Sequence, residues 1–352
     1  FPTRRSSDLN KKGDKMKILI TGGAGYIGSH VTKQLIESKN YEIVVIDNFC
    51  KGSNLAIQTL KDVAKKNEVK FEFINLSLEN IDELEDVFKE HKFEAIIHFA
   101  AFIEVFESTQ KPLKYYRNNS ANALNLITLC AKYNVNKFIF SSTAAVYGEP
   151  KDGIVKEETP LNPINPYGRS KVVTEWILKD YALSNPNFKY GILRYFNVAG
   201  ASNDGLLGQN YPNATHLIKV ATQTILGKRE KMSIFGEDYE TEDGSCIRDY
   251  IHIEDLAAAH LSVLKYLNEG GKSEIFNVGY GKGYSVKEVV KKAKEVSGVD
   301  FKAEVSGRRD GDPARLVADS TKLRSLTNWE PKNDDLGLII SSALKWEKKI
   351  KG

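Results

Sequence analysis

The sequence predicts an α/β fold, with a doubly wound parallel sheet joined to a smaller mixed α/β lobe. Up to about residue 197, short apolar runs alternate with polar segments of helical periodicity, which is typical of a parallel sheet covered on both faces. The first apolar run ends in glycines and leads into a helical pattern, as in the Rossmann type of sheet. From about residue 198 the pattern changes to loops rich in Gly, Asn and Asp with isolated helical stretches.

Each expected element follows from its own run of residues. KILIT (17–21) is the first strand, and helical periodicity follows its glycines as far as Ile36. EIVVID (42–47) is a buried strand, because a short continuous apolar run bounded by turn residues is typical of one. The remaining strands are expected at 70–75, EAIIHFA (94–100), KFIFSS (137–142) and YGILRYF (190–196). The isolated helices of the second lobe are expected near 214–228, 254–268, 285–297 and 333–349.

The composition of the 352 residues is that of an ordinary globular protein, with 41% hydrophobic and 27% charged residues. No apolar run approaches the ~18 residues of a membrane span, so no membrane partner is expected. Residues 1–15 are polar and precede a methionine, and we expect a non-native or disordered leader there. They supply three of the four net positive charges. The nearly neutral remainder has no basic stripe that would favour nucleic acid.

The cysteines and histidines predict neither a disulfide framework nor a metal site. The three cysteines are Cys50, Cys130 and Cys246, an odd number spread far apart. This usage fits a reducing cytoplasm. The six histidines lack the spacing of metal ligands.

The segment TGGAGYIGS (21–29) predicts a dinucleotide site. Gly22 permits a tight turn, Gly25 lets the backbone approach a pyrophosphate, and Gly28 lets the following helix pack closely. The amides at the start of that helix would face the anion. Asp47 ends the next strand, nineteen residues after Gly28, where a carboxylate bonds the ribose 2′-hydroxyl and favours NAD over NADP. Residues 16–197 are therefore predicted to be an NAD-binding domain, and 198–352 mainly a substrate lobe that can be interleaved with it.

INPYGRSK (164–171) places a tyrosine and a lysine four residues apart, on one face of a helix. A free tyrosine has a pKa of ~10 and is a poor base at neutral pH. A cation about 4 Å away contributes roughly 4 kcal/mol at an effective dielectric constant of ~20, which corresponds to about three pKa units. Tyr167 beside Lys171 is therefore expected to act as a base. Without the glycine segment, a solvated lysine beside a core tyrosine is the simpler interpretation.

From Met16 to about Lys348 the chain resembles the UDP-glucose 4-epimerases of the extended short-chain dehydrogenase/reductase family. The motifs that carry this resemblance are TGGAGYIGSH, HFAA, SSTAAVYG, NPYGRSK, RYFNVAGA, TEDGSCIRDYIHIEDLA and RRDGDPARLVAD. The glycine segment and YxxxK identify the superfamily, whereas the last three motifs are more specific to epimerases. The resemblance implies NAD-dependent, reversible 4-epimerisation of UDP-hexoses through a 4-keto intermediate, with NAD held as a prosthetic group.

The resemblance also implies a role for particular residues. Tyr167 would be the base, Thr143 would hydrogen-bond the sugar 4-hydroxyl, and Lys171 would hold the nicotinamide ribose and depress the pKa of the tyrosine. The implied cofactor-binding residues are Gly22, Gly25, Tyr26, Ile27, Gly28, Asp47, Asn48, Asn75, Leu76, Phe99, Ala100, Ala101, Asn118, Ser141, Tyr167, Lys171 and Tyr195. The implied substrate-binding residues are Thr143, Tyr167, Asn197, His216, Leu217, Arg248, Arg309, Asp312 and Leu316.

Two residues help to choose among related enzymes. Dehydratases similar to this chain carry Asp and Glu directly after the threonine, and decarboxylases a glutamate in the second of these places. Here both places hold alanine, Ala144 and Ala145, which cannot move protons. A UDP-sugar dehydratase or decarboxylase is therefore a disfavoured alternative. A non-catalytic NAD-sensing regulator is another, although such proteins commonly lose the tyrosine or the lysine.

Four further expectations rest on the resemblance. Leu316 replaces a tyrosine of relatives restricted to plain hexoses, so activity on UDP-GlcNAc and UDP-GalNAc is also expected; the less favoured alternative is that Leu316 only packs in the core. Ile103 replaces a lysine that in some epimerases touches the cofactor phosphates. His216 replaces an asparagine and is interpreted as a packing residue of the lobe. A homodimer is expected through helices near 117–133 and 168–184, with interface or core candidates Leu124, Ile127 and Val172.

Overall fold

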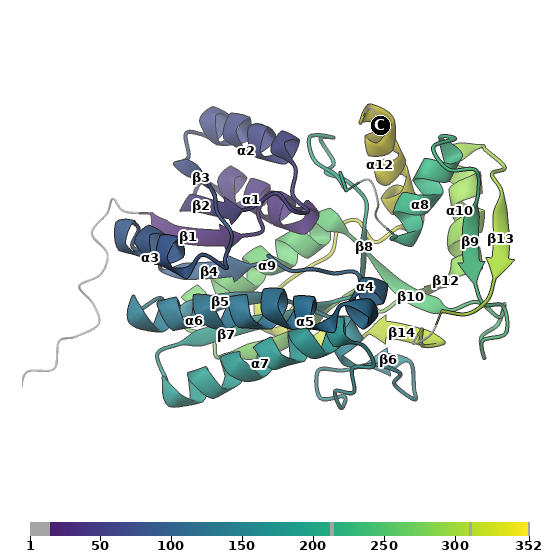
Figure 1. The fold of residues 1–352 in the computed structure, drawn as a ribbon. Helices are drawn as coiled ribbons and strands as arrows, with labels where there is room; N and C mark the ends of the chain where they lie inside the picture. Colours follow the sequence, from purple (N-terminus) through teal and green to yellow (C-terminus); the bar gives the residue numbers. More distant parts are fainter. Residues whose placement is uncertain (1–14, 212–214, 310–311, 351–352) are drawn as a thin grey trace, which may run out of the picture.

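A parallel sheet of seven strands forms the centre of the part of the chain that the structure, a computed structural model, describes: residues 15–211, 215–309 and 312–350 (Figure 1). The strands are β1 (Met16–Thr21), β2 (Tyr41–Asp47), β3 (Phe71–Asn75), β4 (Ala95–His98), β5 (Lys137–Thr143), β7 (Lys189–Tyr195) and β11 (Glu274–Val278). Their order is β11-β7-β5-β4-β1-β2-β3. The order reverses between β1 and β4, which is where such sheets open a ligand crevice at the carboxyl ends of their strands. The predicted fold class and the six predicted strands are confirmed.

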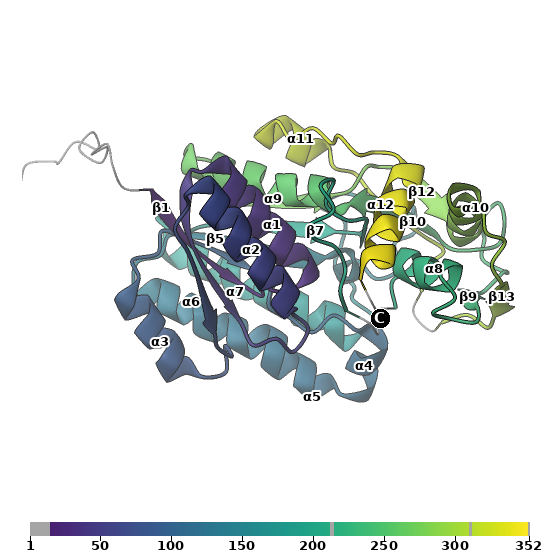
Figure 2. The ribbon, with the colours of Figure 1, turned by 90° about the horizontal axis from the view of Figure 1, so that it is seen from above.

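Helices cover both faces of this sheet (Figure 2). One face carries α1 (Tyr26–Ser38), α2 (Asn54–Asn67) and α9 (Ile253–Asn268), and the other carries α3 (Ile81–Glu90), α6 (Asn122–Lys132) and α7 (Pro166–Ser184). Successive residues of a strand point to opposite faces. Ile18 and Ile20 therefore pack under α1, whereas Leu19 packs under α3 and α6. Two buried faces explain why these strands are continuous apolar runs.

Short helical pieces connect β4 to α6. They are α4 (Val105–Gln110), α5 (Pro112–Tyr115) and the π-helical turn η1 (Tyr116–Ala121), which runs directly into α6. The helix expected near 117–133 thus begins earlier in the chain and contains a π-helical turn. A 3₁₀ turn, η2 (Ala144–Val146), follows β5.

The second lobe is built from short strands and three helices within the described residues. Its strands are β6 (Ile154–Val155), β8 (Asn197–Ala199), β10 (Ile247–His252), β12 (Gly283–Ser285) and β14 (Arg315–Ala318), with the separate pair β9 (Met232–Phe235) and β13 (Ala303–Ser306). Its helices are α8 (Leu217–Ile225), α10 (Val286–Ser297) and α12 (Leu336–Lys349), whereas α11 (Thr321–Thr327) contacts α9 and β11 of the large sheet. The helix predictions near 214–228, 254–268, 285–297 and 333–349 are confirmed as α8, α9, α10 and α12. The short strands and α11 were not predicted.

Each half of the sequence contributes a strand to the sheet built mainly by the other half. β11 follows the first elements of the second lobe but pairs with β7 at the edge of the large sheet. β6 lies early in the sequence but pairs with β14 of the second lobe. The division of the chain into domains at residue 197 therefore stays a prediction, because the connections cross it in both directions.

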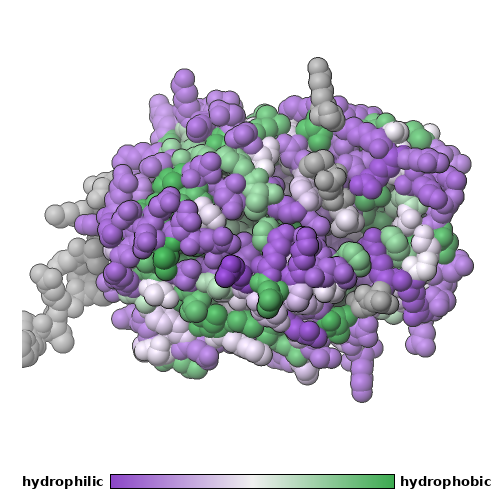
Figure 3. Space-filling model, in the orientation of Figure 1, coloured by the Kyte–Doolittle hydropathy of each residue, from purple (hydrophilic) through white to green (hydrophobic). Residues whose placement is uncertain are grey.

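The face of the molecule seen in Figure 3 is mostly polar, and its apolar side chains are unevenly placed. In Figure 3 apolar and near-neutral residues gather along the lower part of the face, over the region that α6 and α7 occupy in Figure 1. Leu124 of α6 and Trp176 of α7 are among the exposed apolar side chains of these helices. None of the described helices is both long and apolar enough to cross a membrane.

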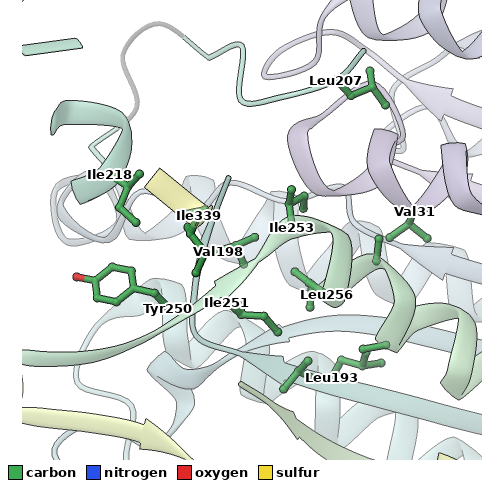
Figure 4. Packing of buried hydrophobic residues seen from close by; sticks show 14 of the residues in the cluster. Val31, Leu193, Val198, Leu207, Ile218, Tyr250, Ile251, Ile253, Leu256 and Ile339 are labelled. Atoms are coloured by element: carbon green, nitrogen blue, oxygen red, sulfur yellow. The ribbon is translucent and has the colours of Figure 1, made fainter. Parts of the chain in front are cut away.

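One continuous core extends from the large sheet into the second lobe (Figure 4). Val31 of α1, Leu193 of β7 and Leu256 of α9 belong to the same buried cluster as Ile218 and Ile339 of the second lobe. Leu207, in the connection after β8, also belongs to it. The two halves are therefore fixed relative to each other by shared apolar burial.

Candidate active site

The turn after β1 approaches the β4 loop too closely for any side chain. Gly22 has φ +75°, and a Cβ there would lie 2.6 Å from the backbone nitrogen of Ala100. A Cβ on Gly28 would lie 2.3 Å from the carbonyl oxygen of Gly22, so this glycine lets α1 pack against the turn. Gly25 is the N-cap residue of α1, and the first turn of that helix contains no acidic side chain. The first amides of α1 are thus placed as an anion-binding helix terminus.

A pocket of about 610 Å³ opens beside this turn, between the loops that follow β1, β2, β3 and β4. Its lining includes nine of the predicted cofactor residues, Gly22, Gly25, Asp47, Asn48, Leu76, Phe99, Ala100, Ala101 and Asn118. It also includes residues that were not predicted, Ile46, Cys50, Lys51, Gly52, Ser77, Leu78 and Asn122. Most of these follow the carboxyl end of a predicted strand, and that position is the sequence signal that could have identified them.

Asp47 lies at the end of β2, with its carboxylate held in the pocket wall. Oδ2 accepts a hydrogen bond from the Ala24 amide (3.0 Å) and Oδ1 one from the Phe49 amide (2.7 Å). Burial raises the pKa of this carboxyl, and the two amides act in the opposite direction. The bare glycine turn, the helix terminus and this carboxylate together fit NAD, with its pyrophosphate on the amides and a ribose hydroxyl on the acid.

Eight predicted cofactor residues do not line this pocket. Four of them, Ser141, Tyr167, Lys171 and Tyr195, belong to the catalytic cluster described below, and the other four lie around the glycine turn and at the end of β3. The Tyr26 hydroxyl donates to the Gly200 carbonyl oxygen (2.7 Å) and so joins α1 to the segment after β8. Ile27 packs against the core, and Gly28 has the packing role described above. Asn75 is exposed at the end of β3. Their role in cofactor binding stays a prediction.

The predicted catalytic residues converge at the carboxyl edge of the sheet. Thr143 ends β5, and Tyr167 and Lys171 occupy the first turns of α7. That helix begins at Pro166, where a proline is favourable, and the Asn165 side chain caps it by accepting from the Gly168 amide (2.9 Å). The cap fixes the start of α7 so that Tyr167 hydrogen-bonds the Thr143 side chain.

Lys171 points back to the end of β5. Its Nζ donates to the Ser141 carbonyl oxygen over 2.8 Å and lies 4.9 Å from the centre of the Phe140 ring. Burial lowers the pKa of this lysine to about 7, and the Glu175 carboxylate acts in the opposite direction. Glu175 itself is bound to Arg194 through a buried ion pair of 2.5 Å.

The expected depression of the pKa of Tyr167 is not seen in the protein alone. Burial raises the pKa of Tyr167, and the hydrogen bond with Thr143 lowers it only in part. The shift is opposite to the one expected from a neighbouring cation, because the phenol and Lys171 are both desolvated. The positive charge of the lysine is directed to the Ser141 carbonyl oxygen.

Ser141 and Tyr195 lie beside this cluster on adjacent strands, and their hydroxyl groups hydrogen-bond each other. Burial raises the pKa of Tyr195, and the hydrogen bond with Ser141 acts in the opposite direction. The end of β4 completes the edge, since His98 Nδ1 lies 2.6 Å from Thr21 Oγ1 at the start of the glycine turn. The catalytic cluster and the glycine turn therefore share one edge of the sheet.

Apart from Thr143 and Tyr167, the predicted substrate residues form two groups. Asn197, His216 and Leu217 line a second pocket of about 430 Å³ between β8, α8 and α12. Its lining includes Gln209, Lys219, Tyr250, Trp346 and Glu347, which the sequence did not single out. His216 is the N-cap residue of α8 and its Nδ1 lies 3.0 Å from Gln209 Nε2; its interpretation as a packing residue stays a prediction.

The second group lies on and beside β10 and β14. Arg248 Nη2 is 3.3 Å from Asp312 Oδ1, and its Nη1 donates to the Pro313 carbonyl oxygen (2.7 Å). The Arg309 guanidinium is exposed and lies 3.7 Å from the centre of the Phe235 ring. Arg308, by contrast, is paired with Asp238 at 2.7 Å. Arg309 is thus the freer of the two adjacent arginines.

Leu316 is placed opposite Arg248 in the pairing of β10 with β14. It is 8% exposed and belongs to a buried cluster with Ala144 and Phe196. Ala144 directly follows Thr143 in the sequence, and Phe196 directly precedes Asn197. Leu316 therefore packs in the core and also lies in the layer that supports the candidate sugar site. Among the described residues, no cluster of three or more His, Cys, Asp or Glu side chains could hold a metal ion.

Comparison with known proteins gives a consistent result. Residues 18–279 match the NAD dependent epimerase/dehydratase family. A UDP-glucose 4-epimerase of Azospirillum brasilense is 46% identical over 334 residues, which are 95% of this chain and 92% of that protein.

Two solved structures illustrate the same similarity. The UDP-Glc/GlcNAc 4-epimerase of Campylobacter jejuni is 56% identical, with a TM-score of 0.83 over 95% of this chain and 100% of that one. The UDP-glucose 4-epimerase of Bifidobacterium longum, in complex with NAD⁺ and UDP, is 35% identical, with a TM-score of 0.89 over 95% and 98% of the two chains.

Proposed function

The chain belongs to the NAD dependent epimerase/dehydratase family, and on this premise we propose that it catalyses the reversible 4-epimerisation of UDP-hexoses. The observation that carries this proposal is the convergence of Tyr167, Thr143 and Lys171 at the sheet edge that also bears the glycine turn. When bound, NAD⁺ supplies a hydride acceptor for sugar C4 and returns the same hydride, so the reaction has no net redox change.

Residues of the chain itself accept and return the proton of the sugar 4-hydroxyl. Tyr167 accepts the proton of the 4-hydroxyl as that carbon is oxidised and returns it when the carbon is reduced. Thr143, which hydrogen-bonds Tyr167, orients the hydroxyl and the resulting 4-keto oxygen. Lys171, on the same helical face, would bind the nicotinamide ribose. These roles are proposals that the burial and hydrogen bonds of the three residues support.

Epimerisation also needs a sugar that can turn while its nucleotide stays fixed. Arg248 and Arg309 supply guanidinium groups suited to a diphosphate, whose oxygens match their forked donors. Asp312 would accept from the uridine ribose, and Asn197, His216 and Leu217 would line the nucleotide side of the site. A substrate held at that end can rotate about its diphosphate linkage and present either face of the 4-keto sugar.

The chemistry next to Thr143 disfavours the alternatives. Ala144 and Ala145 form the 3₁₀ turn that begins directly after β5 and carry no titratable group. Removal of water or carbon dioxide needs an acid or base there. The relatives named above are epimerases, which agrees with this reasoning.

Three finer properties belong to the proposal. Leu316, smaller than tyrosine, leaves room for an N-acetyl group, and the Campylobacter jejuni relative is named for both UDP-Glc and UDP-GlcNAc. A homodimer through α6 and α7 would cover Leu124 and Trp176, which are 48% and 55% exposed. A reducing, cytoplasmic location is consistent with three free cysteines.

A direct test is to incubate the purified protein with UDP-galactose, without added NAD, and to separate the nucleotide sugars. The expected result is an equilibrium mixture with UDP-glucose. Formation of a 4-keto-6-deoxy sugar instead would indicate dehydration, and a parallel incubation with UDP-glucuronate, which carries the carboxyl group that UDP-galactose lacks, tests for decarboxylation to a pentose. Absence of any conversion, with NAD bound, would favour a non-catalytic role.

A further inference from the structure

Three side chains from distant parts of the sequence meet at the NAD pocket. Lys51 Nζ lies 2.5 Å from Glu104 Oε1 and 2.5 Å from the Tyr211 hydroxyl, and that hydroxyl donates to Glu104 Oε1 (3.0 Å). The ammonium also lies 4.1 Å from the centre of the Tyr211 ring. The lysine and glutamate side chains are 26% and 30% exposed, so their attraction is only partly screened by solvent.

The positions of these residues make the cluster a bridge. Lys51 lines the pocket from the loop after β2, and Glu104 follows Ala101, which lines the pocket from the loop after β4. In the sheet, β2 and β4 lie on either side of β1, which carries the glycine turn. A bond between Lys51 and Glu104 therefore connects the two walls of the pocket across the turn.

Tyr211 brings the second lobe into this bridge. It ends the described part of the segment after β8, which is held against α1 at several points. Asp204 forms an ion pair of 2.7 Å with Lys33, and Leu207 is buried in the core beside α1 (Figure 4). Asn210 donates to the Ser53 hydroxyl (2.8 Å) in the same loop as Lys51. The segment is thus anchored along its length and meets the pocket at Lys51.

We propose that Lys51, Glu104 and Tyr211 form a latch that retains NAD by holding the pocket walls together. This inference rests on the proposed function, and it concerns release of the cofactor rather than the chemistry. An enzyme that returns every hydride gains nothing from exchanging its cofactor, so slow release is useful. The three residues are positioning residues, because they act on the walls and not on the reacting atoms.

The latch compensates for a departure noted in the sequence. Ile103 stands where some epimerases use a lysine against the cofactor phosphates, and its neighbour Glu104 instead binds a lysine from the opposite wall. Closing the walls can retain the cofactor without a direct charge on it. Breaking a hydrogen bond to a charged group is expected to speed NAD release about tenfold or more.

The test measures cofactor release in the full-length protein. NAD⁺-loaded protein is mixed with excess alcohol dehydrogenase and ethanol, and the NADH formed from released NAD⁺ is followed by absorbance. Glu104→Gln, which removes the ion pair, is expected to release NAD⁺ about tenfold faster or more. Tyr211→Phe, which keeps the ring, should accelerate release less. High salt should accelerate release from the unmodified protein more than from Glu104→Gln.

A matched control exists on the far side of the first domain. Glu85 binds Lys132 (2.5 Å) and Tyr133 (2.7 Å) in a similar cluster that is not part of the pocket lining. Glu85→Gln should release NAD⁺ at the unmodified rate. Equal release rates in all variants would overturn the latch, even if the protein epimerises UDP-galactose. If Glu104→Gln does not fold, an unchanged rate in Tyr211→Phe overturns it alone. A protein that holds no NAD contradicts the proposed function as well.

Discussion

The ammonium of Lys171 donates a 2.8 Å hydrogen bond to the carbonyl oxygen of Ser141, and burial lowers the pKa of this lysine to about 7. A free lysine has a pKa of ~10.4, so between these values the unfolded chain binds the proton that the folded chain has lost. The contribution of Lys171 to stability therefore rises with pH across this range. It is least favourable below pH 7, where the lysine is charged in both states.

Lys171→Met should remove this dependence. The difference in free energy of unfolding between the unmodified protein and the variant should move in favour of the unmodified protein as pH rises from about 7 to about 10. Denaturant titrations at several pH values measure this difference. A difference that stays constant with pH would contradict the proposed burial of the charge.

Tyr167→Phe should abolish turnover, because only the phenolic oxygen that carries the proton is removed. The loss in stability should be about 1 kcal/mol, the usual contribution of one hydrogen bond, here the bond with Thr143. Turnover of UDP-galactose and thermal unfolding are measured in parallel. Normal activity at neutral pH would show that Tyr167 is not the base.

The protein should purify with NAD(H) and discriminate against NADP(H), because the Asp47 carboxylate would face the 2′-phosphate. Heat extraction followed by mass analysis identifies the bound cofactor. Asp47→Asn should weaken the preference, since an amide still accepts a hydrogen bond from the Ala24 or Phe49 amide but carries no charge. Recovery of mainly NADP from the unmodified protein would be inconsistent with this assignment.

Leu316→Tyr should reduce turnover of UDP-GlcNAc strongly and spare UDP-galactose, because a ring would fill the space of the N-acetyl group. Leu316 is buried beside Ala144 and Phe196, so overpacking is a competing effect. Leu316→Met, which conserves volume, is the control and should keep both activities. Equal losses for both substrates in Leu316→Tyr would mean that the side chain only supports the core.

Leu124→Glu on α6 should convert a dimer into a monomer, because it places a charge in the proposed contact. Leu326→Glu on α11 is a matched control, since Leu326 is also exposed but lies on another helix. Light scattering at micromolar concentration compares the three proteins. If the unmodified protein is already monomeric, the proposed dimer is wrong.

The sequence allowed the sheet, its helices and the glycine turn to be predicted, because apolar periodicity and glycine spacing are local signals. Burial is not local. The pKa of Tyr167 shifts in the direction opposite to the one expected, since the desolvation of a side chain depends on what packs over it. For the same reason, the sequence could not tell which of Leu124, Ile127 and Val172 lie in the core. In the structure Ile127 and Val172 are each 3% exposed and belong to the core, whereas Leu124 is exposed.

Contacts between remote segments were also beyond prediction. Lys51, Glu104 and Tyr211 each look like ordinary surface residues in the sequence, and only folding brings their side chains together. The pairing of Arg248 with Asp312 is of the same kind, although the resemblance had already assigned both residues to the substrate. Short strands such as β6 and β12 were not predicted, because two or three residues are too few to show a periodic pattern of apolar side chains.

The place of β11 in the large sheet has a consequence for biosynthesis. The hydrogen-bonding edge of β7 is completed only by Glu274–Val278, which emerge from the ribosome long after β7 itself. Until then a nascent chain presents an open strand edge, which is prone to pairing with other chains. A chain truncated near residue 200 would keep that edge open and would also lack the α9 residues that cover α1 and β7. Expression of the first part alone is therefore expected to give aggregated material, and a chaperone that shields the edge of β7 should raise the yield of the whole chain.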